Sequence, residues 1–268
     1  MNESKMEIIT EQIIQAFVEH KRLFLVFDRD GTLVPYTEDP KHAILADSVR
    51  KILNKLAAQN NISIGILSAR GLKQLRRDFY DGMQILAGNS GLEIQKQKQL
   101  TRRHPAAVAA RDMLREAKIH LEEEILPSFP SILEDHGLSL CLHWQRTPIA
   151  FRPDLFKQLD LIRLKLPGLH FKEMPTSFEI WPAIEWDKAC GLKEMLQILN
   201  LKAEETALLY AGDTEADLPA LDFVKSKNGI TIQIGRTSSD EHFHLESPQE
   251  LHELLRKLES KLVPKQAI

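Results

Sequence analysis

The chain has 268 residues and a formal net charge of −3, with 43% hydrophobic and 27% charged residues. This length is generous for one compact core, so we expect a main domain with a smaller module. The composition is ordinary for a soluble globular protein. Because basic residues are interspersed with acidic ones, the charge gives no case for nucleic-acid binding.

The two cysteines, Cys141 and Cys190, are too few for a disulfide scaffold or a cysteine-rich metal site. Both lie among apolar residues, which predicts small buried hydrophobes. The N-terminal stretch has no uninterrupted apolar run, and no segment approaches the length of a membrane span. We therefore expect a cytoplasmic protein without a membrane partner.

The first part of the chain alternates between helical patterns and short apolar runs. Apolar positions recur at helical spacing near the N-terminus. The apolar runs are short enough for strands that are buried on both faces. The expected helices cover residues 8–17, 47–58 and 72–79, and the expected strands cover 23–27, 62–67 and 84–88. This alternation predicts a parallel, doubly wound α/β sheet.

The middle of the chain has a different pattern, which describes a small α+β module. Helices are expected over 105–125 and 154–166, with strand-like segments at 131–135, 138–144, 169–173 and 177–181. We place this module at residues 97–178, inserted into a core formed by 1–96 and 179–268. The first pattern then resumes, with a helix over 188–199, strands over 206–212 and 229–235, and a closing amphipathic helix after Ser247-Pro248.

Two aspartates follow the first expected strand, in the segment LVFDRDGTLVP. At the end of a buried strand, Asp28 can attack phosphorus as a carboxylate and form an aspartyl-phosphate. Asp30 lies on the same side of an extended segment, where it can protonate the leaving alcohol and then activate water. Thr32 offers a hydroxyl to phosphate. For an isolated pair of aspartates a solvated or capping role would be preferred, but the strand and the remote partners favour catalysis.

Two acids after a later strand, in LLYAGDTEADLPAL, can serve as metal ligands. Ligands of parallel sheets bind at the carboxyl edge, so these acids are expected beside the first pair. Asp213 and Asp217 can complete an all-oxygen Mg²⁺ site with Asp28 and the backbone carbonyl of Asp30. Taken alone, Asp213 could equally be a helix cap.

A hydroxyl and an ammonium group supply the remaining parts of a phosphoryl-transfer site. Ser68, in GILSARG, can donate a hydrogen bond to a phosphoryl oxygen. Lys188, in WDKACGL, can neutralise the nucleophile and the phosphoryl charge. Singly, Ser68 could be a helix cap and Lys188 could be exposed at a helix start. Their order after the expected elements favours one coherent site.

These motifs, in this order, resemble those of the haloacid dehalogenase superfamily. The matching positions are Asp28 and Asp30, Ser68, Lys188, and Asp213 and Asp217. The resemblance implies an α/β fold with a Rossmann-like parallel-sheet core, an aspartyl-phosphate intermediate and Mg²⁺ as cofactor. It also implies that the module at 97–178 is an α+β cap domain over the active site. Its position in the chain matches the cap type that is common among sugar phosphatases.

A narrower resemblance, to trehalose-6-phosphate phosphatases, covers most of the chain. It is carried by the segments LAGNSGLEI, LEDHGLSLCLHWQRTP, FEIWPAIEWDKACGLKEML and FHLESPQELHELLRKL. It implies that Glu134, His143 and Glu179 face the sugar, and we add Arg70 to these substrate-binding residues. Carboxylates suit this role because they accept pairs of hydroxyl hydrogen bonds. Without the resemblance, cross-strand charges and a buried histidine would be the preferred interpretation.

The sequence departs from the usual family pattern at several positions. They are Ser-Ala-Arg at 68–70, Ser90, His136, Trp-Gln at 144–145, Lys-Ala at 188–189 and Gly-Asp-Thr-Glu-Ala-Asp at 212–217. None of these removes a core catalytic group. His136 replaces a typical lysine and Gln145 a typical arginine, so cationic contacts to the sugar or its phosphate are lost.

The leading hypothesis is therefore an Mg²⁺-dependent phosphatase that acts on a small sugar phosphate, trehalose 6-phosphate first, in trehalose biosynthesis. Sucrose, glucosylglycerate and mannosylglycerate phosphates are the alternative substrates. A non-catalytic sensor or a subunit regulating a synthase would be expected to lack Asp28 or Asp30. A phosphotransferase would share the same intermediate. We expect no fused synthase domain, which leaves a separate synthase as one candidate partner.

Overall fold

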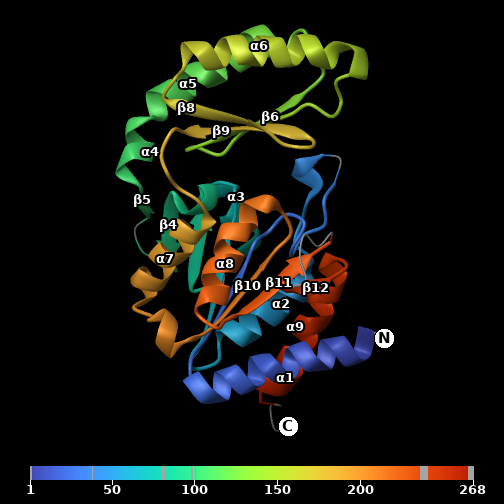
Figure 1. Ribbon diagram of the computed structural model, residues 1–268, viewed down its shortest axis with the longest axis vertical. Coiled ribbons are helices and arrows are strands. Elements are labelled where there is room, and N and C mark those ends of the chain that lie inside the picture. The colour runs from blue at the N-terminus through green and yellow to red at the C-terminus, as the bar shows by residue number, and fades with distance from the viewer. Residues whose placement is uncertain are drawn as a thin grey trace.

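A large mixed sheet forms the lower part of the molecule (Figure 1). The computed structural model describes residues 2–37, 39–79, 82–97, 99, 101–235 and 241–264. Within them the sheet has eight strands, in the order β12 (Phe243–Leu245), β11 (Ile230–Ile234), β10 (Ala207–Gly212), β1 (Leu23–Phe27), β2 (Ile62–Leu67), β3 (Ile85–Gly88), β4 (Glu93–Lys96) and β5 (Arg102–Arg103). The pairs from β12 to β3 are parallel, and β4 and β5 join through antiparallel pairs.

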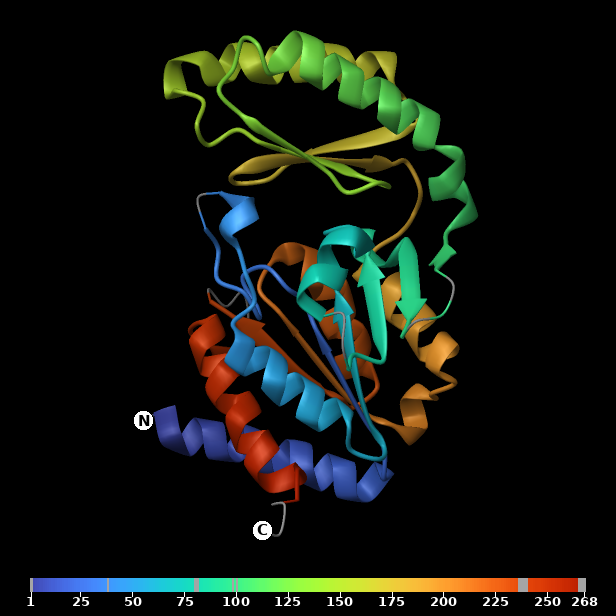
Figure 2. The ribbon, with the colours of Figure 1, turned by 180° about the vertical axis from the view of Figure 1, so that it is seen from behind.

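The central strands are buried on both faces, as their apolar runs predict. All five residues of β1 are buried. Leu25 and Phe27 pack into the core on one face, and Phe24 and Val26 into the core on the other. The first core is covered by α1 (Asn2–His20), α2 (Asp47–Ala57), α3 (Leu72–Phe79) and α9 (Pro248–Leu262), and the second by α7 (Lys188–Leu199) and α8 (Leu218–Ser226). Figure 2 shows the first set of helices in front of the sheet.

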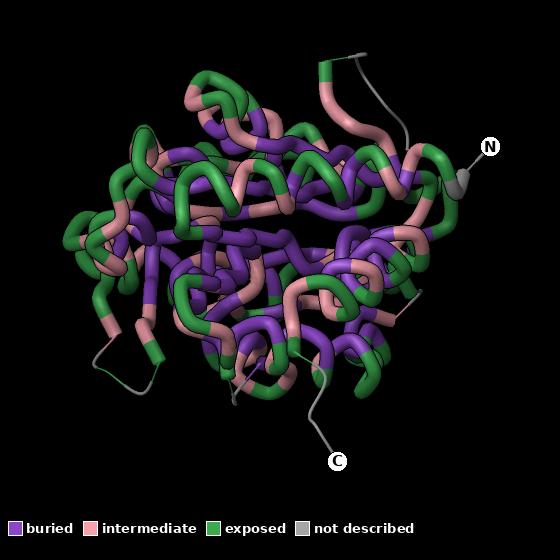
Figure 3. The backbone as a smooth tube through the Cα atoms, turned by 90° about the horizontal axis from the view of Figure 1, so that it is seen from below, coloured by how far each residue is buried: buried purple, intermediate pink, exposed green. Residues whose placement is uncertain are grey.

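Burial follows this layered arrangement. Seen from below, the buried segments of the backbone run through the middle of the molecule, and the outer sides of the helices are exposed (Figure 3). The predicted fold class, an α/β protein with a Rossmann-like core and an inserted α+β module, is confirmed. Among the described residues, none of the helices combines the length and apolar character needed to cross a membrane.

The inserted module lies above the carboxyl edge of the large sheet (Figures 1 and 2). Its antiparallel sheet has the order β6 (Ile132–Asp135), β7 (Leu140–His143), β9 (Ser177–Pro182) and β8 (Leu169–Glu173). The helices α5 (Arg111–His120) and α6 (Arg152–Lys165) cover its outer face. Because side chains alternate along a strand, Phe178 and Ile180 pack under these helices, and Glu179 and Trp181 point towards the large sheet. This module is called the cap below.

The expected domain limits fall close to strands of both sheets. β5 lies beyond residue 97 and still pairs with β4 of the large sheet. β9 runs past residue 178 to Pro182 within the cap sheet. The division into 1–96 with 179–268 and 97–178 stays a proposal. The pairing of β5 and β9 suggests that the first limit lies after residue 103 and the second after residue 182.

The helical pattern expected over 105–125 is present, but it is interrupted at Ala110. It consists of α4 (Pro105–Ala109), α5 and a π-helical turn over Leu121–Ile125, and the break is at Ala110. Ala107 of α4 packs with Leu92 of the core, whereas Leu114 of α5 packs inside the cap. The break at Ala110 therefore lies between the part of the segment that packs on the core and the part that packs in the cap.

Candidate active site

The carboxyl ends of three neighbouring strands bring the predicted catalytic residues to one edge of the sheet. Asp28 follows β1, Ser68 follows the adjacent β2, and Asp213 follows β10 on the other side of β1. The backbone N–H of Asp28 donates to Ala211 O at 2.9 Å, which fixes the β1 end beside β10. Lys188 is the first residue of α7, which packs on the same part of the sheet.

A buried ammonium group joins two buried carboxylates. Nζ of Lys188 donates to Oδ1 of Asp28 at 2.8 Å and to Oδ1 of Asp217 at 2.6 Å. All three side chains are almost fully buried. Burial alone would lower the pKa of Lys188, but the carboxylates of Asp217 and Asp28 raise it well above its usual value. Lys188 therefore stays positively charged beside Asp28.

Asp217 is held from every side. Its Oδ1 also accepts from the hydroxyl of Tyr210 at 2.6 Å. Its Oδ2 accepts from the backbone N–H and the hydroxyl of Thr214 at 3.1 and 2.9 Å. Burial acts to raise the pKa of Asp217, but Lys188 lowers it, so the group is ionised. Asp217 is thus placed to orient Lys188. Tyr210 escaped prediction, although a single hydroxyl in the fully buried strand β10 is a usable signal.

The acidic groups at this edge fit a hard divalent cation. Carboxylate oxygens of Asp28, Asp213 and Asp217 lie within 4.8 Å of one another. Burial, and then the Asp217 carboxylate, raise the pKa of Asp213 to about 6. Burial likewise raises the pKa of Asp28, with Lys188 opposing and Asp217 and Asp213 adding to the effect. One ammonium thus faces three carboxylates, and an oxygen-binding cation such as Mg²⁺ would relieve this excess of negative charge.

Asp213 has two hydroxyl partners from the loop after β1. Thr32 Oγ1 donates to its Oδ1 at 3.2 Å, and Tyr36 donates to its Oδ2 at 2.8 Å. The hydroxyl of Thr32, predicted to contact phosphate, is thus directed to a carboxylate. Nothing in the sequence singles out Tyr36. Gly31 has a φ of +83°, and a Cβ there would lie 2.1 Å from Oδ2 of Asp213, so this turn requires glycine.

Two arginines hold Asp30. Arg70 donates to both of its carboxylate oxygens, from Nε at 2.6 Å and from Nη2 at 2.9 Å. Arg29 donates to Oδ1 at 2.5 Å and is itself buried against Asp78. Arg29 was missed, although an arginine between two aspartates at the end of a buried strand is expected to be paired. Ser68 is buried, and its Oγ accepts from the backbone N–H of Arg70 at 3.2 Å.

Arg70 also connects the core to the cap. Its Nη1 lies 3.4 Å from Oε1 of Glu134 on β6. Oε2 of Glu134 is 2.9 Å from Nε2 of His143 and 3.8 Å from Nε2 of His136. Burial would raise the pKa of Glu134, but the two imidazoles lower it well below its usual value. Gln74 adds a hydrogen bond to Glu134 at 3.3 Å. Glu134, His143 and Arg70, all predicted to bind substrate, are thus engaged with one another across the interface.

A cavity of about 270 Å³ lies between the cap and the catalytic edge. Its core wall includes Lys188 and Ser90, and its cap wall includes His136, Lys172 and Glu179. Of the predicted substrate-binding residues, Glu179 is the one that lines it. The side chain of His136 is 6% exposed, and its Nε2 is buried without a hydrogen-bond partner in the described residues. A buried polar atom of this kind is expected to meet a ligand or water.

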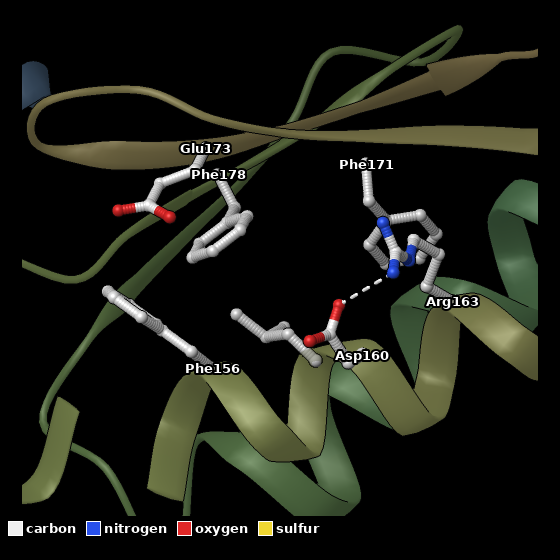
Figure 4. A pocket seen from close by; sticks show the side chains of 7 residues that line it. Phe156, Asp160, Arg163, Phe171, Glu173 and Phe178 are labelled. Carbon is white, nitrogen blue, oxygen red and sulfur yellow. Dashed lines mark ion pairs between the residues drawn. The ribbon is translucent and has the colours of Figure 1, made fainter. Parts of the chain in front are cut away.

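A smaller cavity of about 160 Å³ lies within the cap, between α6 and the outer face of the cap sheet (Figure 4). Phe156, Phe171 and Phe178 surround it, and Asp160 pairs with Arg163 at 3.1 Å at its rim. Phe178 is on the opposite side of β9 from Glu179. This cavity therefore faces away from the catalytic edge.

The sequence matches the family model described as Trehalose-phosphatase over residues 26–250. Trehalose-phosphate phosphatase B of Arabidopsis thaliana is 23% identical over 92% of this chain and 69% of its own length. Trehalose-phosphate phosphatase of Mycobacterium bovis is 28% identical over 88% of this chain and 61% of its own length.

Solved structures share the fold. The crystal structure of a trehalose-6-phosphate phosphatase related protein has a TM-score of 0.77 at 16% identity, covering 89% of this chain and 97% of that one. The C-terminal domain of Candida albicans trehalose-6-phosphate phosphatase has a TM-score of 0.72 at 19% identity, covering 94% and 96%. A haloacid dehalogenase-like hydrolase from Bacteroides thetaiotaomicron aligns with a TM-score of 0.58 at 15% identity, covering 88% and 99%. The resemblance to trehalose-6-phosphate phosphatases is confirmed, and the solved structures share the fold that the haloacid dehalogenase resemblance implies. The chain belongs to the trehalose-phosphatase family of phosphoric monoester hydrolases.

Proposed function

We propose that the protein hydrolyses trehalose 6-phosphate to trehalose and phosphate, with Mg²⁺ as cofactor, in trehalose biosynthesis. The observation that carries the proposal is the buried contact of Lys188 with Asp28 and Asp217. This contact lies beside Asp213, at the wall of the cavity between the cap and the core. This is a site for a phosphoryl group, in a chain that belongs to a phosphatase family. A cytoplasmic location and a separate synthase as partner stay predictions.

In the first step of this mechanism, a carboxylate oxygen of Asp28 attacks phosphorus and the bond between phosphorus and the sugar oxygen breaks. Asp30, two residues further along the same loop, gives its proton to the leaving sugar oxygen. The products of this step are the free sugar and an aspartyl-phosphate on Asp28. In the structure Arg70 and Arg29 donate to both oxygens of Asp30, so Asp30 must give up at least one of these hydrogen bonds to carry the proton.

In the second step, Asp30 takes a proton from a water molecule, and the water oxygen attacks phosphorus. The bond between phosphorus and the Asp28 oxygen breaks, which releases phosphate and restores both carboxyl groups. Lys188 stabilises the negative charge that builds up on the phosphoryl oxygens, and Ser68 donates a hydrogen bond to one of them.

The cation would be held by the carboxylates of Asp28 and Asp213 and by the backbone carbonyl of Asp30, with Asp217 completing the acidic group. Both oxygens of Asp217 already accept hydrogen bonds, so we assign it chiefly to the orientation of Lys188. When bound, Mg²⁺ supplies positive charge that neutralises the phosphoryl oxygens.

The test is phosphate release from a panel of sugar phosphates, with Mg²⁺ and with a chelator. Trehalose 6-phosphate should be the best substrate, and chelation should abolish turnover. Asp28→Asn should lower kcat by at least about a thousandfold, because the nucleophile is lost. Asp47, exposed at the start of α2, is the matched control, and Asp47→Asn should leave kcat unchanged.

Two results would contradict the proposal. Hydrolysis of a sucrose or glycosylglycerate phosphate without hydrolysis of trehalose 6-phosphate would give the chain another substrate. Turnover that survives in Asp28→Asn would show that the reaction does not proceed through an aspartyl-phosphate on Asp28. A non-catalytic sensor is disfavoured because both Asp28 and Asp30 are present at the edge.

A further inference from the structure

The cap wall of the cavity carries an ammonium group with no role in the mechanism above. Lys172 of β8 lines the cavity together with Glu179 and Trp181 of β9. Lys172 stands directly opposite Glu179 in the antiparallel pair. Side chains at such positions share one face of the sheet, with Cβ atoms about 5 Å apart. Lys172 and Glu179 therefore place opposite charges next to each other on the face towards Lys188.

The other strong cations at the site are already occupied. Lys188 contacts Asp28 and Asp217, and Arg70 contacts Asp30 and Glu134. Lys172 is exposed, and its Nζ makes no hydrogen bond or ion pair with any part of the chain that the structure describes. Its three N–H donors are thus available to a ligand in the cavity.

The surroundings of Lys172 define the chemistry that it would recognise. The carboxylate of Glu179 also has no hydrogen-bond partner among residues whose placement is described, and it offers acceptors beside the ammonium donors. The two groups together are neutral, and they suit sugar hydroxyls, which both donate and accept. A second negative group, such as a glycerate carboxylate, would be attracted by Lys172 but repelled by Glu179, whereas sugar hydroxyls can use both groups. The ring of Trp181 adds an apolar surface for sugar C–H groups.

We propose that Lys172 is a specificity-determining residue whose ammonium donates hydrogen bonds to hydroxyl groups of the phosphate-free sugar ring. Glu179 accepts hydrogen bonds from neighbouring hydroxyls of the same ring. The inference rests on the proposed function, because it places the phosphate at the Lys188 end of the cavity and the second ring at the cap end. It makes an uncharged glycosyl group the preferred occupant of that end.

The test compares Lys172→Met with Lys157→Met. Lys157 is exposed on α6, on the opposite side of the cap sheet from the cavity, and serves as the matched control. Each protein is assayed with trehalose 6-phosphate, with a glycosylglycerate phosphate and with p-nitrophenyl phosphate, which carries no sugar. Binding of trehalose 6-phosphate to Asp28→Asn, with and without Lys172→Met, gives the same comparison in the absence of turnover.

Lys172→Met should raise KM for trehalose 6-phosphate about tenfold, equivalent to about 1.4 kcal/mol, with little change in kcat. Hydrolysis of p-nitrophenyl phosphate should be unchanged, and Lys172→Arg should retain part of the affinity. Equal KM values in the Lys172 and Lys157 variants would overturn the inference, as would an equal loss with p-nitrophenyl phosphate. If the wild type cleaves a different sugar phosphate, the proposed function fails, and the same comparison on that substrate still decides the role of Lys172.

Discussion

Lys188 lies between two buried carboxylates, and its charge offsets buried negative charge on both sides. If the ammonium is removed, Asp28 and Asp217 remain buried without compensation. Breaking a buried ion pair by removing one partner typically costs about 3–5 kcal/mol of stability. The same charge is the one proposed to stabilise the transferring phosphoryl group, so stability and catalysis share a residue here.

Lys188→Met should therefore lower Tm clearly and reduce kcat by at least about a hundredfold. Thermal unfolding and phosphate release would measure the two effects. Lys51→Met, at an exposed position of α2, is the control and should change neither quantity. A Lys188→Met protein with wild-type turnover would show that this ammonium does not take part in the reaction.

Asp213 gives the site a dependence on pH. Its pKa in the folded protein is about 6, above the ordinary 3.8. A carboxyl group with a raised pKa favours folding when protonated, so its contribution is present below about pH 4 and is lost as the pH rises to about 6. Above that pH the ionised Asp213 repels the neighbouring carboxylates of Asp28 and Asp217 in the metal-free site, and a bound cation would relieve this repulsion.

Saturating Mg²⁺ should accordingly raise Tm more at about pH 7.5 than at about pH 5, where the cation must first displace a proton from Asp213. Thermal unfolding with and without Mg²⁺ at both pH values measures the difference. Asp213→Asn should reduce the shift at the higher pH. Equal shifts at the two pH values would mean that Asp213 does not control the binding of the cation.

At the scale of elements, Asn89 links two turns from different sheets. It lies in the turn after β3, has a φ of +51° and is buried. Its Nδ2 donates to His136 O at 3.0 Å, and its Oδ1 accepts from Ser139 Oγ at 2.7 Å. His136 and Ser139 belong to the turn between β6 and β7 of the cap. One amide thus fixes the cap hairpin to the core.

Asn89→Ala should lower the stability by about 1–3 kcal/mol, because buried polar partners are left unsatisfied. It should also raise KM, because the cap wall of the cavity is no longer fixed. Denaturant unfolding, substrate kinetics and hydrogen exchange at residues 136–139 would report these changes. Gln158→Ala on the exposed face of α6 is the comparison. Unaltered exchange at the hairpin in Asn89→Ala would argue against this role.

Elements could be predicted where the local sequence pattern alone determines them. The strands β1, β2 and β8 have the predicted limits. For β1 and β2 this is because a short apolar run, buried on both faces, marks the whole strand. The strands β4 and β5 were not predicted. β5 has two exposed arginines and pairs only because β4 is beside it. Whether such an edge strand forms depends on the neighbouring strand and not on its own sequence pattern.

The same limit applies to the site. Asp28, Ser68, Lys188 and Asp213 could be predicted because they end or begin regular elements. Arg29 and Tyr210 were missed although each has a local signal, and Tyr36 has none, because its partner Asp213 lies far away in the sequence. Arg70 and Glu134 were predicted for the substrate, and their contact with each other depends on how the cap sits on the core.

At the scale of the whole molecule, the cap and the core share a continuous set of charged contacts. It runs from Asp78 through Arg29, Asp30 and Arg70 to Glu134 in the cap. Asp30, the proposed acid of the reaction, is thus connected to the cap through a single residue, Arg70. Any movement of the cap that displaces Glu134 also changes the surroundings of Arg70, the residue that holds Asp30.

The insertion of the cap also sets the order in which the protein can be completed during synthesis. β1 lies between β2 and β10, and Leu23 pairs with Ala207. A growing chain therefore exposes one edge of its most apolar strand until the whole cap has left the ribosome. Closing so long a stretch of chain is slow, and an open apolar strand edge invites association between nascent chains. The position of the insertion makes the period between the synthesis of β2 and β10 the time at which this open edge is exposed to other chains.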